Sequence, residues 1–113
     1  MENHSLRWQK VLDFFKLKFT DGESPKMDTI LFLIGVQELG MIKPSFTKDE
    51  KLNLMHVATC KLLEPFGYYE FDRMDEEGWP HYKAVKALET DKIQQEQLMQ
   101  EAIVNYFTSN NIV

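Results

Sequence analysis

Between Tyr68 and Val85 the sequence alternates aromatic and charged residues on both sides of an acidic loop, Asp75-Glu76-Glu77-Gly78. Alternation of this kind places every second side chain on the same face of a β-strand, whereas a helix would scatter these groups. The stretch therefore predicts a β-hairpin over about residues 68–85. A hairpin limits the fold strongly, because the remaining elements must supply the surface on which it packs.

A four-residue loop would fix the register of this hairpin. On one face, Glu70 would lie opposite Lys83 and Asp72 opposite His81. Such opposite-charge pairs stabilise neighbouring strands. Pro80 has no N–H to donate, so we expect it at an edge or at a position without a hydrogen bond. The other face would collect Tyr69, Phe71, Tyr82 and Ala84.

Apolar residues recur with helical spacing in four other segments, three before the hairpin and one after it. They predict helices over about residues 5–19, 25–39, 47–64 and 91–108. The apolar faces expected for the first, third and fourth helices are Trp8, Val11, Leu12, Phe15 and Phe19; Leu52, Met55, Thr59, Leu62 and Leu63; and Ile93, Leu98, Ala102, Ile103, Tyr106 and Phe107.

The second helix is expected to form the centre of the core. Residues 30–36 are apolar on all sides of the helix, which indicates that it is covered on most of them. Gly35 lowers helix propensity by about 1 kcal/mol relative to alanine. We therefore expect another helix to cross closely at this glycine.

Three helix starts carry recognisable capping residues. Thr47 and Glu50 have the spacing of a capping box, in which each side chain accepts a hydrogen bond from the other residue's backbone N–H. Ser24-Pro25 has the pattern of an N-cap followed by proline at the first helical position. Either Thr90 or Asp91 is expected to cap the last helix.

The predicted fold class is α+β, mainly α, with three helices, a hairpin and a C-terminal helix in one domain over residues 1–113. The alternative is an all-α bundle of four to five helices. A chain of 113 residues can bury one core without metals or disulfides. The element order resembles that of winged-helix domains, and KLLEPFGYYEF (residues 61–71) looks like the end of a recognition helix followed by the first strand of a wing.

Winged-helix likeness implies nucleic-acid binding, but the charges argue against it. The chain has a net charge of −5, whereas nucleic-acid binding depends on Lys and Arg near the phosphates. The third helix would be the one that contacts the DNA bases, yet it carries as many acidic as basic side chains. The tip of the wing would carry three acidic residues. The charged residues of that helix are Lys48, Lys51, Lys61, Asp49, Glu50 and Glu64.

The sequence also limits the expected location. One cysteine, Cys60, cannot form a disulfide within the chain, and Met1 to Lys10 lacks a charged and then apolar leader. The longest apolar run, residues 30–36, is far shorter than the roughly 18 residues that cross a bilayer. We therefore expect a cytoplasmic protein without a membrane segment.

Two sets of residues could in principle carry chemistry. His56 and Cys60 lie one helical turn apart and are weak candidates for metal ligands. Cys60, His81 and Asp72 could supply a nucleophile, a base and an orienting carboxylate. Glu64 lies a further turn along from the first set, but a thiolate metal site normally has more cysteines, and the second set has no oxyanion-hole signature. We predict no catalytic residues, no metal and no cofactor, with His56 at the boundary of the core and Cys60 buried as a small apolar side chain.

The hairpin aromatics favour a different role. A short hairpin cannot bury all of its tyrosines and its tryptophan, and such residues at a surface often anchor protein interfaces. The alternative is that they cover the protein's own core. The sequence predicts a protein-protein interaction or regulatory module that binds a protein partner or a second copy of itself; the alternatives are a winged-helix-like nucleic-acid-binding protein and a metal- or thiol-dependent enzyme. The predicted partner-binding residues are Tyr68, Trp79, His81 and Tyr82.

Overall fold

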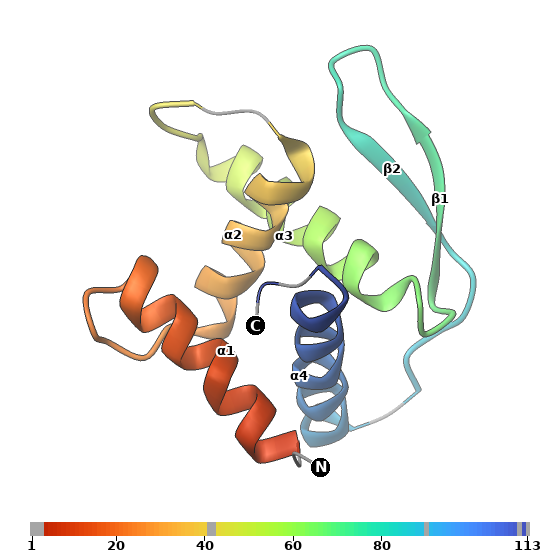
Figure 1. Cartoon of the computed structure of the whole chain (residues 1–113). Coiled ribbons are helices and arrows are strands. Elements are labelled where there is room, and N and C mark those ends of the chain that lie inside the picture. Colours follow the sequence, from red (N-terminus) through yellow and green to blue (C-terminus); the bar gives the residue numbers. More distant parts are fainter. Residues whose placement is uncertain (1–3, 41–42, 90, 111, 113) are drawn as a thin grey trace. The chain divides into compact units, whose positions relative to one another are not determined.

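The structure, a computed structural model, describes residues 4–40, 43–89, 91–110 and 112. This part of the chain contains four helices and one two-stranded antiparallel sheet (Figure 1). The predicted α+β, mainly α fold is confirmed, and the all-α alternative is wrong. In chain order the elements are α1 (His4–Lys18), α2 (Met27–Leu39), α3 (Lys48–Leu63), β1 (Tyr69–Met74), β2 (Pro80–Ala84) and α4 (Lys92–Ser109).

The chain divides into two compact units. One consists of residues 1–26 and 88–113 and holds α1 and α4; the other consists of residues 27–87 and holds α2, α3 and the hairpin. The prediction of a single domain over residues 1–113 stays a prediction. No helix in the described ranges is long and apolar enough to cross a membrane.

In the first unit, α1 and α4 contact each other through aromatic rings. The Phe107 ring of α4 lies edge-on to Phe14 and Phe15 of α1, with 5.5 Å between ring centroids in each pair. Two residues predicted on apolar faces are instead exposed, since Phe19 is 56% and Ile93 70% accessible. Both lie at the end of a helix, where fewer neighbours cover a side chain. The buried residues of this unit are Val11, Phe15, Ala102, Ile103, Val104, Tyr106 and Phe107.

In the second unit, α2 and α3 cross closely at Gly35, as predicted. A Cβ on Gly35 would lie 2.7 Å from the carbonyl carbon of Leu54 and 3.0 Å from its Cα. Only hydrogen fits in that space, which explains a glycine in the middle of a helix. Residues 30–36 are all buried or half-buried, in agreement with their continuous apolar character.

Helix α3 begins at the predicted capping box. The Thr47 hydroxyl accepts a hydrogen bond from the Glu50 N–H at 3.1 Å, and the Glu50 carboxylate accepts one from the Thr47 N–H at 2.9 Å. The predicted inward position of Leu52 is wrong, because its side chain is 55% exposed. The buried stripe starts instead at Leu54 and continues through Val57 and Ala58, which restores the i, i+3, i+4 spacing.

The other two predicted helix starts have different outcomes. Helix α2 begins at Met27, so Ser24-Pro25 lies before the helix and does not cap it. Asp91 caps α4, because its carboxylate accepts a hydrogen bond from the Gln94 N–H at 2.8 Å. The other candidate cap, Thr90, lies outside the described residues.

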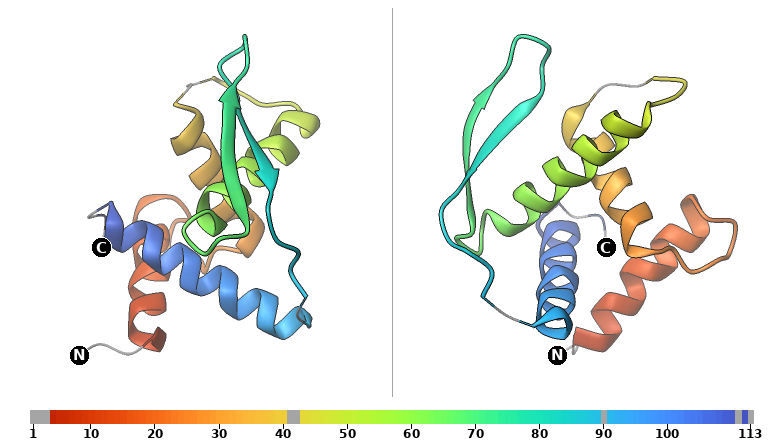
Figure 2. Two further views of the ribbon diagram at one scale, coloured as in Figure 1. Left: turned by 90° about the vertical axis from the view of Figure 1, so that its right-hand side faces the viewer. Right: turned by 180° about the vertical axis from the view of Figure 1, so that it is seen from behind.

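The hairpin lies alongside α3 in each view of the molecule (Figures 1 and 2). The half of the hairpin farther from the loop has the predicted register, with Tyr69 opposite Ala84, Glu70 opposite Lys83 and Phe71 opposite Tyr82. In the half nearer the loop, a β-bulge at position 72 shifts the register by one residue, so that Arg73 pairs with His81 and Met74 with Pro80. Both strands of a two-stranded sheet are edges, which accommodates Pro80 as expected.

Candidate functional site

The hairpin loop is one residue shorter than predicted. The Gly78 N–H donates to the Asp75 carbonyl at 3.1 Å, and the Asp75 N–H donates to the Trp79 carbonyl at 2.9 Å. Glu76, Glu77 and Gly78 thus form a three-residue loop, and Gly78 has the positive φ of 86° that such a loop needs at its last residue. The shorter loop shifts the register by one residue, and the bulge at position 72 restores it.

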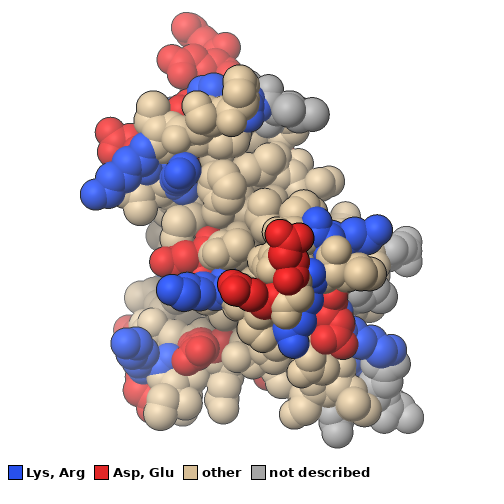
Figure 3. Space-filling view, turned by 90° about the vertical axis from the view of Figure 1, so that its left-hand side faces the viewer, with Lys and Arg blue, Asp and Glu red and all other residues tan. Residues whose placement is uncertain are grey.

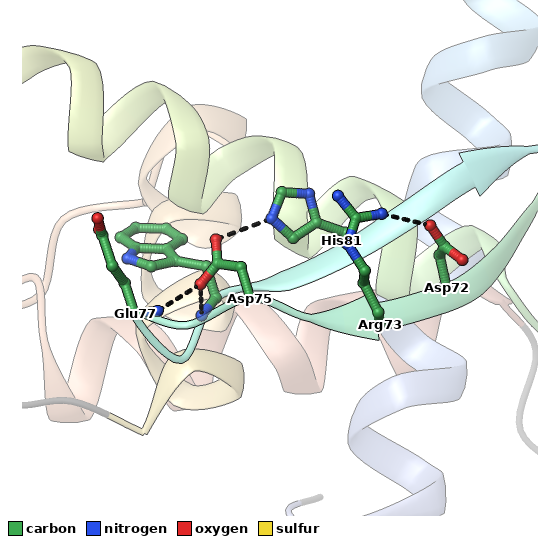
Figure 4. A network of polar contacts seen from close by, with 6 residues as sticks. Asp72, Arg73, Asp75, Glu77 and His81 are labelled. Carbon is green, nitrogen blue, oxygen red and sulfur yellow. Dashed lines mark hydrogen bonds and ion pairs between the residues drawn. The ribbon is translucent and has the colours of Figure 1, made fainter.

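Asp75 organises this loop. One oxygen of its carboxylate accepts hydrogen bonds from the backbone N–H groups of Glu77 and Trp79, each at 2.9 Å. The other oxygen lies 2.8 Å from Nε2 of His81 (Figure 4). These contacts, first His81 and then the Trp79 N–H, hold the pKa of Asp75 below its ordinary value. The carboxylate fixes the backbone of the loop and the orientation of the imidazole together.

The predicted pairing of Asp72 with His81 is therefore wrong. Asp72 occupies the bulge and forms an ion pair with its neighbour Arg73 at 2.7 Å, while His81 turns to Asp75 (Figure 4). The other predicted cross-strand pair, Glu70 with Lys83, is present at 4.0 Å. Both of its side chains are exposed, so it contributes little to stability.

A cleft of about 260 Å³ lies between α3 and the hairpin, within the second unit. Figure 4 shows the side chains of Asp75, Glu77 and His81 on the same side of the hairpin ribbon. From α3, three residues at i, i+3 and i+4 complete the wall opposite them. The residues that line the cleft are Asn53, His56, Val57, Asp75, Glu77, Trp79, Pro80, His81 and Tyr82.

Tyr82 keeps its proton at physiological pH. Burial raises the pKa of its phenol to about 12, and the negative charges of Glu64 and Glu38 add to the effect. The hydroxyl can therefore donate a hydrogen bond into the cleft. Its ring packs edge-on against Phe71 across the strands, with 5.7 Å between centroids, which holds it in place.

Three of the four predicted partner-binding residues meet in this cleft. Trp79, His81 and Tyr82 line it and are half-buried. Tyr68 does not line it. Its carbonyl accepts a hydrogen bond from the Val85 N–H at 2.9 Å, and its ring lies 4.3 Å from Nζ of Lys86. Tyr68 thus closes the base of the hairpin, and a binding role for the other three stays a prediction.

His56 and Cys60 lie as close together as their helical spacing predicts. Sγ of Cys60 is 3.5 Å from Nε2 of His56, and the His56 ring is 6.4 Å from that of Tyr69. Cys60 is fully buried, as expected of a small apolar side chain, whereas His56 is exposed at the cleft. Burial raises the pKa of the Cys60 thiol to about 11, so the metal-binding and nucleophilic thiolate is disfavoured.

The structure does not assemble the candidate chemistries. Within residues 4–40, 43–89, 91–110 and 112, no three or more His, Cys, Asp or Glu side chains are placed to hold a metal ion. The trio of Cys60, His81 and Asp72 is not brought together, because His81 is paired with Asp75 and Cys60 does not line the cleft.

Sequence reasoning missed the wall that α3 contributes. Asn53, His56 and Val57 have the spacing of one helix face, and that signal was present in the sequence. What the sequence did not indicate was that the hairpin would lie against this face. Asp75 and Glu77 belong to the predicted acidic loop, and their place at the cleft depends on the loop being shorter than predicted.

Comparison of the chain with known protein families, with curated proteins and with solved structures found no match.

Proposed function

We propose that this protein is a small cytosolic protein-protein interaction or regulatory module, without catalytic activity, that binds its partner through the cleft between α3 and the hairpin. The observation that supports this most directly is the meeting of Trp79, His81 and Tyr82 in one concave site. Tryptophan and tyrosine that are half-buried in a cleft offer a large contact area with few rotamers to freeze on binding.

The size of the cleft favours a protein partner over a cofactor. Sites for drug-sized molecules and cofactors usually enclose about 300–1,000 Å³. The cleft here measures about 260 Å³, which is at the small end of such sites, and it is partly open to solvent, which suits a single side chain projecting from a larger partner.

Charge argues against the winged-helix-like alternative of nucleic-acid binding. The tip of the hairpin carries three acidic residues, Asp75, Glu76 and Glu77. On α3, Nζ of Lys61 lies 3.9 Å from the Glu64 carboxylate, which offsets its charge. On the face shown in Figure 3, Lys and Arg side chains are scattered among Asp and Glu side chains. A phosphate backbone needs a continuous basic surface, and its approach to the hairpin tip would bring like charges together.

The enzyme alternative has weaker support than the binding role. A catalytic cysteine needs a depressed pKa and access to substrate, and Cys60 has a raised pKa and a buried side chain. The pairing of His81 with Asp75 resembles the base and orienting carboxylate of a catalytic triad. However, no Ser, Thr or Cys is among the described residues that line the cleft with them.

Replacing both Trp79 and Tyr82 by alanine tests the proposal. We expect helicity by circular dichroism to be nearly unchanged, because α2 and α3 pack on each other independently of the cleft aromatics. The proteins captured by the chain in a pull-down, or its oligomer mass by light scattering, should change. If the double variant captured the same proteins as the original chain and had the same oligomer mass, the proposal would be contradicted.

The matched control is Met74→Ala. Met74 lies on the same hairpin and is 54% exposed, but it does not line the cleft. The substitution removes exposed apolar surface from the hairpin and leaves the residues that line the cleft unchanged. Its pull-down profile and oligomer mass should therefore equal those of the original chain.

A further inference from the structure

The charges that line the cleft limit what its occupant can be. Two carboxylates, Asp75 and Glu77, line it, whereas its described lining residues include no Lys or Arg. The nearest arginine on the hairpin, Arg73, is outside the cleft and forms an ion pair with Asp72 at 2.7 Å. Carboxylates therefore outnumber Lys and Arg side chains at the cleft, which disfavours phosphates and carboxylates there and favours cations.

The two carboxylates differ in the number of hydrogen bonds and ion pairs that they form. Both oxygens of the Asp75 carboxylate have partners, namely His81 and two backbone N–H groups. The Glu77 carboxylate has neither a hydrogen bond nor an ion pair to any described residue, and in Figure 4 it carries no dashed line. The Glu77 carboxylate is therefore available to a partner at the cleft.

The aromatic walls suit the same kind of occupant. The electron-rich faces of Trp and Tyr attract ammonium and guanidinium groups, most strongly for Trp. In the described part of the chain, neither the Trp79 indole N–H nor the Tyr82 hydroxyl has a hydrogen-bond partner. A long cationic side chain could place its methylene stem against Val57 and Pro80, which also line the cleft, and its charge near Glu77.

An apolar side chain would fit less well. It would take the Glu77 carboxylate and the Tyr82 hydroxyl partly out of water without supplying a hydrogen bond, which costs free energy for each group. An acidic side chain would in addition face two like charges. Of the side chains that a partner protein could insert, Lys and Arg meet both the shape and the charge of the cleft.

We infer that the cleft between α3 and the hairpin binds a lysine or arginine side chain that projects from a partner protein, with its cation held by Glu77 and the face of Trp79. This inference rests on the proposed function, because it names the partner's chemistry for the same site. It predicts a partner with a basic segment.

The two tryptophans provide the test. Trp79 lines the cleft and Trp8 is on α1, so the two indole N–H signals in a proton-nitrogen NMR spectrum report the site and a control position of the same chain. The probes are the blocked amino acids N-acetyl-lysine methylamide and N-acetyl-arginine methylamide, titrated into the full chain. The comparison probes are the corresponding derivatives of ε-acetyl-lysine and glutamate. We expect the two cationic probes to shift the Trp79 signal saturably and the comparison probes to leave it in place.

Charge-removing variants locate the cation. Glu77→Gln should lower the affinity for the cationic probes by about 1.5- to fivefold, the range that corresponds to exposed ion pairs. Glu76→Gln removes the same charge from the neighbouring position, which does not line the cleft, and should leave the affinity nearly unchanged. Equal effects of the two variants would mean general attraction to an acidic loop and would overturn the inference.

The inference and the proposed function can fail separately. If the ε-acetyl-lysine or glutamate probe shifts Trp79 as strongly as the lysine probe, or no probe shifts it, the cationic occupant is wrong. The proposed function would still stand if the Trp79 and Tyr82 double variant lost its partner or changed its oligomer mass. If that variant kept both, the proposed function would fail even where the cationic probes bind.

Discussion

Gly35 of α2 lies directly against the backbone of Leu54 in α3, and three backbone atoms of Leu54 would be within 3.0 Å of any Cβ at this position. Gly35→Ala should therefore destabilise the protein although alanine is the better helix former. Alanine gains about 1 kcal/mol of helix propensity, while overpacking against a rigid backbone costs about 1–3 kcal/mol or more. Because the atoms in the way belong to the backbone of Leu54, we expect the upper end of this cost and a net loss of about 2 kcal/mol in the free energy of unfolding in urea.

Gln37→Ala is the matched control for this substitution. Gln37 is exposed on the same helix, two residues along. Its replacement should change the free energy of unfolding by less than about 0.5 kcal/mol. A Gly35→Ala variant as stable as the original chain would show that α2 and α3 do not cross as closely as described.

Asp75 has two separable roles in the hairpin, and two substitutions separate them. Asp75→Asn keeps a side-chain oxygen that can accept from the Glu77 and Trp79 N–H groups, but it removes the charge facing His81. Asp75→Ala removes both. We expect the Trp79 amide to exchange with solvent slowest in the original chain, faster in Asp75→Asn and fastest in Asp75→Ala. Equal exchange in the two variants would mean that the side-chain hydrogen bonds do not hold the loop.

The same carboxylate makes the loop sensitive to acid. Its pKa is lowered below the ordinary 3.8, so its stabilising contribution is present above pH 3.8 and is lost as the pH falls through the lower folded value. Exchange of the Trp79 amide, corrected for its intrinsic pH dependence, should increase in that window. Asp75→Asn has no carboxylate to protonate and should show no such step. A loss already complete at about pH 5 would have to come from another group.

The outcome for the hairpin shows what a single sequence specifies. Alternation predicts which residues share a face, and three predicted cross-strand pairs, from Tyr69 with Ala84 to Phe71 with Tyr82, are present because the bulge on β1 offsets the shorter loop. The sequence predicts a four-residue loop because three acidic residues and a glycine follow one another at positions 75–78. A turn closed by Gly78 at positive φ needs only three, and a bulge takes up the extra residue on β1. Alternation alone therefore predicts the faces of the strands, whereas the register depends on the loop and the bulge together.

The candidate site depends on contacts that a sequence does not specify. The capping box of Thr47 and Glu50 was predictable because it is local to four residues. Leu52 was misplaced because two apolar stripes are possible on α3, and the choice depends on packing against α2 through Leu54. Tertiary packing likewise decides that the Asn53, His56 and Val57 face meets the hairpin, and so it creates the cleft.

Nucleic-acid binding is the alternative most easily tested. With a net charge of −5 and an acidic hairpin tip, the chain should pass through heparin and DNA columns without retention at about 50 mM salt. A winged-helix protein that neutralised several phosphates would be retained there and released steeply as salt rose. Retention of that kind would contradict the proposed function in favour of the alternative.

The thiol of Cys60 tests the enzyme alternative. Burial raises the pKa of the thiol from the ordinary 9.0 to about 11, which leaves roughly 100-fold less thiolate at pH 7, and the side chain is also inaccessible. Native protein should therefore react with iodoacetamide at least that much more slowly than glutathione, as followed by mass spectrometry. Unfolding in guanidinium should bring the two rates together, which is the control that the thiol is intact. Labelling of the native chain as fast as glutathione would mean that Cys60 is an exposed thiolate, and the thiol-dependent enzyme would again be the better hypothesis.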